Sequence, residues 1–166
     1  MLKIAKYPEP ILRKTAKPIS DFNAALKKLA ADMAEAMYHD DGIGLAAPQI
    51  SQSLRVVVLG LGKGEYKSYV NPEITFFSKE KISSDEGCLS LPKIFGTVIR
   101  SKKIHIKYYD LDGQIKKEKI KGLGAIVLQH EVDHLNGILF IDRAEKITEG
   151  QDILDSLKKK LNEQIK

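Results

Sequence analysis

The sequence predicts an α+β fold in which antiparallel or mixed β-sheets pack around a helix late in the chain, with a further helix near each end. Short segments typical of strands fill the middle of the chain, and they do not alternate regularly with helices, which argues against a parallel α/β sheet. The 166 residues are 43% hydrophobic and 30% charged, as in ordinary globular proteins. Because the chain shows no repeat and no linker, we expect one domain over residues 1–166.

The first helix is predicted near the N-terminus, after a proline-containing segment that should be extended with short turns. Ser20 or Asp21 can cap this helix, which should end near residues 40–42. Its apolar residues recur every three or four positions and so form one stripe. They are Phe22, Leu26, Leu29, Met33 and Met37.

The middle of the chain predicts a series of short strands separated by turns. A hairpin turn at residues 110–113 joins the last two of them. Residues 86–92 should form a loop or the end of a strand, closed by Pro92. The expected strands cover residues 54–59, 66–70, 73–77, 81–84, 97–100, 103–109 and 114–120.

A second helix is predicted from about Leu123 to Leu135, with Gly137 as a natural stop just beyond its end. It is apolar on most sides, which is typical of a buried helix, yet it carries two histidines and two acidic residues. Burying such groups costs roughly several kcal/mol unless they are paired or bound to a metal. This cost indicates that the polar residues have a function.

The chain should end in an amphipathic helix. Residues 139–143 form a short apolar exit from the buried helix, and Thr148 with Gln151 matches the pattern of a capping box. The apolar stripe of the last helix consists of Ile153, Leu154, Leu157, Leu161 and Ile165.

Charge and the absence of long apolar runs limit the location and the partners. The first residues lack the apolar region and cleavage site of an export signal, and no apolar run approaches the ~20 residues needed to span a bilayer. We therefore expect a cytoplasmic protein that does not bind membranes. The 27 Lys and Arg against 22 Asp and Glu give a net charge of +5, which permits an RNA partner without requiring one.

The late helix contains the pattern His-Glu-x-x-His, with His130 and His134 one turn apart on one face. Two imidazoles so placed can bind one divalent cation, and Glu131 beside them can move protons for a bound water. A catalytic metal needs a third protein ligand. Cys88 is the only cysteine, and the residues alone leave open whether it is that ligand or a buried inert thiol. Two imidazoles and a thiolate would suit zinc or iron(II).

A glycine-containing segment, residues 42–49, precedes the strands. It lacks the spacing and context of a nucleotide-binding loop. Together with the segments around the cysteine and the two histidines, it resembles the signature motifs of the peptide deformylases, in the order of that family. The resemblance spans nearly the whole chain, and the lack of large insertions is similar to the bacterial type I form. The three motifs cover residues 42–49, 86–90 and 129–137.

The resemblance implies an enzyme that removes the N-formyl group from the formyl-methionine of new polypeptides and releases formate. It implies that Cys88, His130 and His134 hold one divalent metal ion per chain, iron(II) natively, with zinc, nickel or cobalt able to substitute. Metal-bound hydroxide would attack the formyl carbon, and Glu131 would act as general acid and base.

Two hydrogen-bond donors are also implied beside the reacting carbonyl. The Gln49 side chain and the backbone N–H of Leu89 would face the developing oxyanion. Such donors stabilise charge that is present only in the transition state, and one of them is typically worth about 3–4 kcal/mol of barrier.

The substrate peptide is expected along the glycine segment, where an extended Ile43-Gly44-Leu45 can pair with it backbone to backbone as an added strand. An apolar pocket for methionine is expected from Ile43 together with Leu123, Ile126 and Val127. One residue departs from the family pattern, because Phe95 stands where many type I members carry an arginine that helps to bind the substrate backbone.

Ligating histidines usually donate their second ring nitrogen to a neighbouring acceptor. Glu86 and Asp133 are available carboxylates, and we expect Arg100 to pair with one of them near the metal. The roles of these three residues are to orient the ligands rather than to contact the substrate.

Two other functions are open at this point. The same helix could serve a metallopeptidase, although the third histidine typical of such enzymes is absent. The positive charge and the lysines at residues 158–160 could instead belong to a ribosome- or RNA-associated protein with a vestigial metal site, but the catalytic residues are intact. The ideas combine if a monomeric deformylase docks on the ribosome through its basic C-terminal helix.

Overall fold

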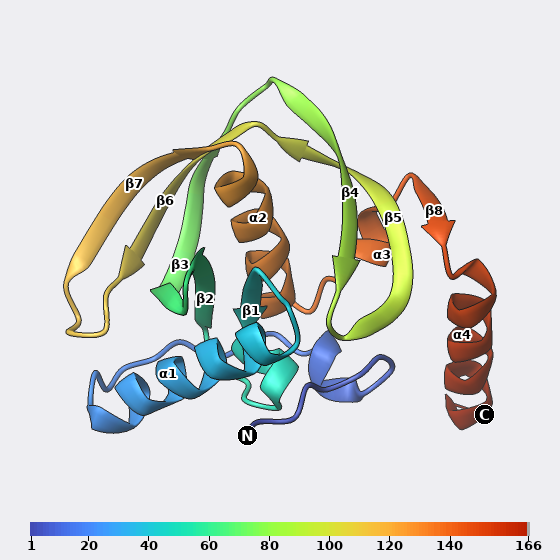
Figure 1. Ribbon diagram of the computed structural model, residues 1–166, viewed down its shortest axis with the longest axis horizontal. Helices are drawn as coiled ribbons and strands as arrows, with labels where there is room; N and C mark the ends of the chain where they lie inside the picture. Colours follow the sequence, from blue (N-terminus) through green and yellow to red (C-terminus); the bar gives the residue numbers. More distant parts are fainter. Residues whose placement is uncertain (166) are drawn as a thin grey trace.

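The computed structural model describes residues 1–165 and confirms the α+β fold (Figure 1). Two antiparallel β-sheets flank a central helix, α2 (Leu123–Leu135). Helix α1 (Ala24–His39) lies across one end of the larger sheet, and helix α4 (Gln151–Ile165) lies beyond the edge of the smaller one. Over residues 1–165, no helix is long and apolar enough to cross a membrane.

The larger sheet has five strands in the order β1-β2-β3-β6-β7, each antiparallel to its neighbours. The smaller sheet has three strands in the order β4-β5-β8, also antiparallel. The strands of the larger sheet are β1 (Gly44–Ala46), β2 (Val56–Gly62), β3 (Glu65–Phe77), β6 (Lys103–Tyr109) and β7 (Ile115–Lys121). Those of the smaller sheet are β4 (Lys81–Cys88), β5 (Leu91–Ser101) and β8 (Lys146–Glu149).

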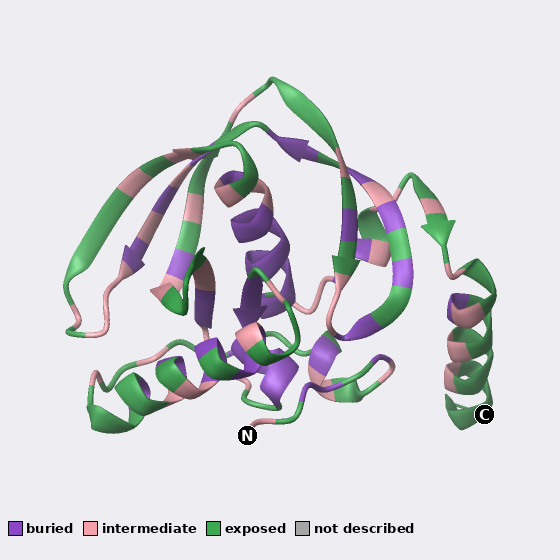
Figure 2. Ribbon diagram, viewed as in Figure 1, coloured by how far each residue is buried: buried purple, intermediate pink, exposed green. Residues whose placement is uncertain are grey.

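The two faces of the larger sheet are covered unequally. On one face, Ile104 and Ile106 of β6 pack in one cluster with Leu128 of α2. On the other face, Val58 of β2 packs with Met37 of α1. Helix α1 therefore covers the β1–β2 end of this second face, and the β6–β7 hairpin stays exposed, as the green strand β7 in Figure 2 shows.

The smaller sheet has its own apolar cluster. Ile94 and Val98 of β5 pack there with Phe140 of a short helix, α3 (Phe140–Arg143), and with Leu154 of α4. Two 3-10 helices, η1 (Pro10–Arg13) and η2 (Ala47–Ile50), connect the N-terminal segment to this framework.

The prediction for the late helix is confirmed at both ends, and 10 of its 13 residues are buried. Strand β6 also has the predicted bounds, 103–109. The first helix is confirmed, but its cap was predicted wrongly. Asn23 precedes the helix, and its Oδ1 accepts a hydrogen bond from the backbone N–H of Leu26 (3.0 Å), so Ser20 and Asp21 lie outside.

Some strands are longer than predicted, because they continue through positions where the sequence suggested a break. Strand β3 is continuous through the predicted break at residues 71–72, because Asn71 adopts a left-handed conformation (φ 49°) within a register shift. Its side chain is held by hydrogen bonds to the backbone of Ile19 (2.8 and 2.9 Å). Within residues 86–92, the first three end β4, Leu89 and Ser90 form a tight turn, and Pro92 lies inside β5 rather than closing the loop.

Short elements were missed. Strands β1 and β8 and helix α3 have three or four residues each, too few for a periodic pattern. The predicted capping box is wrong, because Thr148 belongs to β8 and α4 begins at Gln151, directly after Gly150 in a left-handed conformation (φ 79°).

Gly137, just after α2, provides a test of this packing. It has φ 71°, and a Cβ there would lie 2.5 Å from the backbone oxygen of Arg13. We expect Gly137→Ala to lower the free energy of unfolding by about 2–5 kcal/mol, through a left-handed alanine (~1–2 kcal/mol) and a forced overlap (~1–3 kcal/mol). Urea denaturation measures this loss.

Gly64→Ala is the matched control, since Gly64 has φ 80° with no atom within 4 Å of the added Cβ. It should cost only about 1–2 kcal/mol. Equal losses in the two variants would contradict the close packing of Gly137 against the N-terminal segment.

Candidate active site

Helix α2 presents both histidines of its His-Glu-x-x-His pattern on one buried face. The ring centroids of His130 and His134 lie 5.0 Å apart, and the two residues are only 9% and 1% exposed. Because the helix lies between two sheets, water is excluded from most of its surface. Burial lowers the pKa of His134, so that this ring is neutral, which is the form that binds a metal.

Cys88, at the end of β4, joins the two histidines. Its Sγ lies 3.3 Å from His134 Nε2, and one ligand atom from each of the three residues lies within 4.8 Å of the others. Two imidazoles and a thiol this close are a suitable donor set for one borderline divalent ion. The arrangement favours a ligand role for Cys88 over that of an inert core cysteine.

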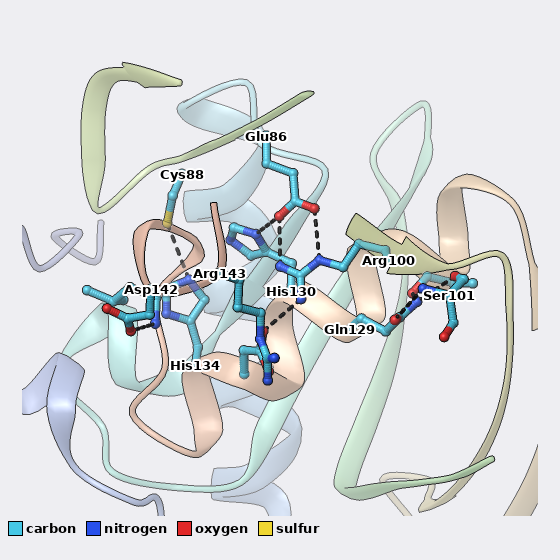
Figure 3. A network of polar contacts seen from close by, with 12 residues as sticks. Glu86, Cys88, Arg100, Ser101, Gln129, His130, His134, Asp142 and Arg143 are labelled. Carbon is cyan, nitrogen blue, oxygen red and sulfur yellow. Dashed lines mark hydrogen bonds and ion pairs between the residues drawn. The ribbon is translucent and has the colours of Figure 1, made fainter. Parts of the chain in front are cut away.

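A buried ion-pair network holds His130 from behind (Figure 3). Glu86 Oε1 lies 2.9 Å from His130 Nδ1, so the ring can donate there and keep Nε2 for a metal. Arg100 donates from Nε and Nη2 to Glu86, both at 2.8 Å. Burial opposes ionisation of Glu86, but the hydrogen bonds from Arg100 and His130 outweigh it and lower its pKa to about 2.

The same network continues along α2. Arg100 Nη1 donates to Asp133 Oδ2 (2.7 Å), and Arg143 donates to both oxygens of Asp133 (2.7 and 2.9 Å). Arg100 therefore pairs with both carboxylates considered for it, and links the smaller sheet to the helix.

Gln129 has a structural role that no pattern in the sequence predicts. Its amide exchanges two hydrogen bonds with the backbone of Ser101, at 2.9 and 3.1 Å, and also donates to Ala125 O (3.0 Å). It thereby joins α2 to the end of β5. The partner is backbone 28 residues away, so neither a motif nor periodicity points to it.

Gln49 extends an amide toward the cysteine from η2. Its Oε1 accepts a hydrogen bond from the backbone N–H of Ala46 (3.0 Å), which fixes the amide orientation. Its Nε2 then faces Cys88 Sγ (3.4 Å) and Ser90 Oγ (3.2 Å). An N–H donor of η2 is therefore directed at the thiol of the metal-site candidate. Leu89, next to Cys88, lines the same surface cleft as Gln49.

Glu131 is buried beside the histidines, and its Oε2 has no hydrogen-bond partner among residues 1–165. Burial raises its pKa to about 7. A carboxyl group with a pKa near neutrality can both accept and release a proton. Gly44 allows β1 to come this close, because a Cβ there would lie 2.8 Å from Glu131 Oε1 and 2.7 Å from Val127 Cγ1.

A cleft of about 590 Å³ opens over these groups. Most of the residues predicted to bind substrate line it, and two of them are strongly exposed apolar side chains, Ile43 at 54% and Leu123 at 65%. The predicted substrate residues in the lining are Ile43, Gly44, Leu123, Ile126 and Val127.

Leu45 is the exception, because its side chain is fully buried in the cluster beneath α1. Gly60 N donates to Ile43 O (3.0 Å), so the alternation of an antiparallel ladder directs the Leu45 backbone toward β2 as well. The same alternation directs the N–H and C=O of Gly44 to the open edge of the sheet. Of the three residues 43–45, only Gly44 therefore offers its backbone to the cleft.

A His-Glu-x-x-His helix, a thiol and a fixed amide around one cleft define a metal-dependent hydrolase. Residues 1–150 match the polypeptide deformylase family model. The peptide deformylase of Thermotoga maritima is 47% identical over 143 residues, which are 86% of this chain and 87% of that protein. The chain belongs to the peptide deformylase family, the enzymes that remove the N-formyl group from newly made polypeptides.

Solved structures agree with this assignment. The crystal structure of the Thermotoga maritima peptide deformylase has a TM-score of 0.85 at 45% identity, and the match covers 88% of this chain and 99% of that one. The Met-Ala-Ser-bound class I type b peptide deformylase from Acinetobacter baumannii has a TM-score of 0.81 at 38% identity, covering 86% and 97%. The resemblance to the bacterial family is confirmed, and the metallopeptidase alternative is set aside.

The ion-pair network leads to a prediction for Arg100. Arg100→Ala would leave Glu86 buried without a cation, which we expect to lower the free energy of unfolding by about 3–5 kcal/mol. Glu86, the acceptor for His130, would no longer be held in place. The metal content after gel filtration should therefore fall as well.

Arg13→Ala is the control, since Arg13 pairs with Asp142 at the surface, where the side chains are 39% and 38% exposed. It should cost no more than about 1 kcal/mol and spare the metal. If Arg100→Ala kept both its metal and its turnover, the positioning role would be refuted.

Proposed function

We propose that Cys88, His130 and His134 hold the catalytic ion of this deformylase and that Glu131 and Gln49 carry out the proton transfer and the charge stabilisation. The observation that carries the proposal is the convergence of three ligand atoms within 4.8 Å beside a buried, unpartnered carboxylate oxygen. Bound there, a divalent ion supplies Lewis-acid chemistry, which polarises a carbonyl and acidifies water. Iron(II) is the proposed native ion, with zinc, nickel or cobalt as substitutes.

Glu131 takes the proton from the attacking water and delivers it to the departing amine of methionine. Its position supports this, since one oxygen lies near Gly44 at the cleft and the other has no competing partner within residues 1–165. The C–N bond of the formamide breaks, formate leaves, and the peptide keeps a free amino group.

Gln49 and the backbone N–H of Leu89 stabilise the oxyanion that forms on the formyl oxygen. The Gln49 amide is held by Ala46 before substrate arrives, so its donor needs no reorganisation during the reaction. A donor fixed in a site with little water acts more strongly than one in solution.

The peptide binds as an added strand along the open edge of β1, with the Gly44 backbone as its partner. Because these contacts involve backbone only, they accept many sequences after the first residue. The methionine side chain covers the exposed apolar surface of Ile43, Leu123, Ile126 and Val127. The peptide bound to the Acinetobacter relative, Met-Ala-Ser, has the composition of such a product.

Phe95 modifies this recognition. It lines the cleft, is 42% exposed, and lies over Gly87, where a Cβ would come within 2.6 Å of the ring. A phenyl ring cannot donate the hydrogen bonds that an arginine gives to a peptide backbone, so β1 carries more of the backbone recognition in this chain.

The proposal places a monomeric enzyme in the cytoplasm, where it meets nascent chains at the ribosome. Helix α4 supports docking there, because it lies at the edge of the molecule and carries three consecutive exposed lysines, residues 158–160. No residue of α4 lines the cleft, which leaves it free to receive a peptide.

Glu131→Gln tests the chemical role. The variant keeps the shape of the side chain but cannot take a proton, so we expect formate release from formyl-Met-Ala to fall by about a hundredfold to ten-thousandfold. Protein prepared anaerobically should keep its metal content, because the three ligands are untouched. Turnover close to that of the unchanged protein would show that another group moves the proton.

Reversing the charge of residues 158–160, from Lys to Glu, tests the docking role. We expect co-sedimentation with ribosomes to fall severalfold, while turnover of short formyl-peptides stays unchanged. Charge reversal is cleaner than deleting the helix, since Leu154 is buried in the core. Undiminished co-sedimentation would exclude docking through α4.

A further inference from the structure

The exposed face of the β6–β7 hairpin concentrates positive charge. Residues opposite each other in an antiparallel pair point to the same side of the sheet. Because Ile104 and Ile106 of β6 face α2, the alternate residues Lys103, His105 and Lys107 face the other way. Three directly opposed pairs on that side are basic: Lys103 with Lys121, His105 with Lys119, and Lys107 with Lys117.

Within residues 1–165, none of these five lysines forms an ion pair. Neighbouring lysines do find acidic partners, as Lys67 does with Glu118 and Lys102 with Glu80. Glu73 is in register with Lys107, but no ion pair joins them. Like charges directly opposite each other destabilise a hairpin, so a bound polyanion would relieve a repulsion that the fold leaves in place.

Aromatic surface lies among these lysines. The Phe76 ring lies against the His105 ring, with centroids 4.4 Å apart and an interplanar angle of 32°, and Phe76 is 43% exposed. A groove of about 390 Å³ runs beside them, lined by Thr75, His105, Ile106, Lys107, Lys117, Glu118 and Lys119. Exposed rings beside cations are typical of surfaces on which bases stack while lysines contact phosphates.

We propose that this surface binds RNA, with its lysines on phosphates and Phe76 against a base. We call it the cationic face, and it consists of Phe76, Lys103, His105, Lys107, Lys117, Lys119 and Lys121. RNA is favoured over an acidic protein or an anionic membrane, because bases and phosphates alternate along one strand and can stack on the ring and contact the lysines together. None of these residues lines the cleft, so bound RNA would leave the cleft free.

Fluorescence anisotropy with a labelled twelve-nucleotide oligouridine tests the proposal. Five phosphate contacts give a slope of about −3.5 for the logarithm of the binding constant against the logarithm of salt concentration, so binding should weaken about a hundredfold between 50 and 200 mM salt. The variant Lys103→Gln/Lys119→Gln/Lys121→Gln should bind at least about tenfold more weakly and lose about 2 units of slope.

A scattered variant, Lys3→Gln/Lys14→Gln/Lys63→Gln, makes the same change in net charge at exposed positions outside the cationic face. It should keep nearly full affinity. Equal losses in the two variants would mean that net charge alone attracts RNA, and would overturn the proposal. Thermal midpoints no lower than that of the unchanged protein, together with unchanged formate release, show that both variants are folded.

Phe76→Ser separates RNA from other polyanions. It should weaken oligouridine binding about tenfold and leave binding to inorganic polyphosphate unchanged, because polyphosphate has no bases. Unchanged oligouridine binding in this variant would overturn the stacking contact. Tighter binding to phosphatidylserine-containing vesicles than to oligouridine would assign the cationic face to a membrane instead.

Discussion

The site depends on one buried ion pair, between Arg100 of β5 and Glu86 of β4. Arg100 also pairs with Asp133 of α2, so this contact holds the smaller sheet to the central helix by charge as well as by apolar packing. Glu86 and Cys88 are two residues apart near the end of β4, and each contacts a histidine of α2, Glu86 with His130 and Cys88 with His134. The contact that orients His130 thus also determines where the thiol meets the histidines.

Stability alone does not explain such a network, because apolar residues of similar volume often replace a buried ion pair without loss. Its value lies in geometry. Glu86 offers His130 a fixed acceptor, and Arg100 keeps that acceptor ionised by lowering its pKa. The opposite environment surrounds Glu131, whose pKa burial raises to about 7. Two buried carboxyl groups near one histidine are thereby suited to different tasks, one to orientation and the other to proton transfer.

Periodicity in the sequence predicted the elements that are long and one-sided, such as the helix 123–135 and the strand 103–109. It could not find β1 or β8, which are too short for a pattern, or the continuity of β3, which depends on a side chain–backbone contact between Asn71 and Ile19. The two histidines were evident from local spacing. Cys88 was not, because it meets them through contacts across 46 residues, and only the resemblance to a family decided between its two interpretations.

The larger sheet explains how this fold can combine a constrained site with a surface that the site does not constrain. Residues that point toward α2 must fit the helix that carries the ligands, so Ile104 and Ile106 are confined to apolar packing. Their neighbours along β6 point the other way, beyond the reach of α1, and nothing in the catalytic geometry restricts them. In this chain Lys103, His105 and Lys107 each lie opposite a lysine of β7, at a cost in hairpin stability that packing does not require. Because these charges destabilise the hairpin, a binding partner explains their presence better than the fold does.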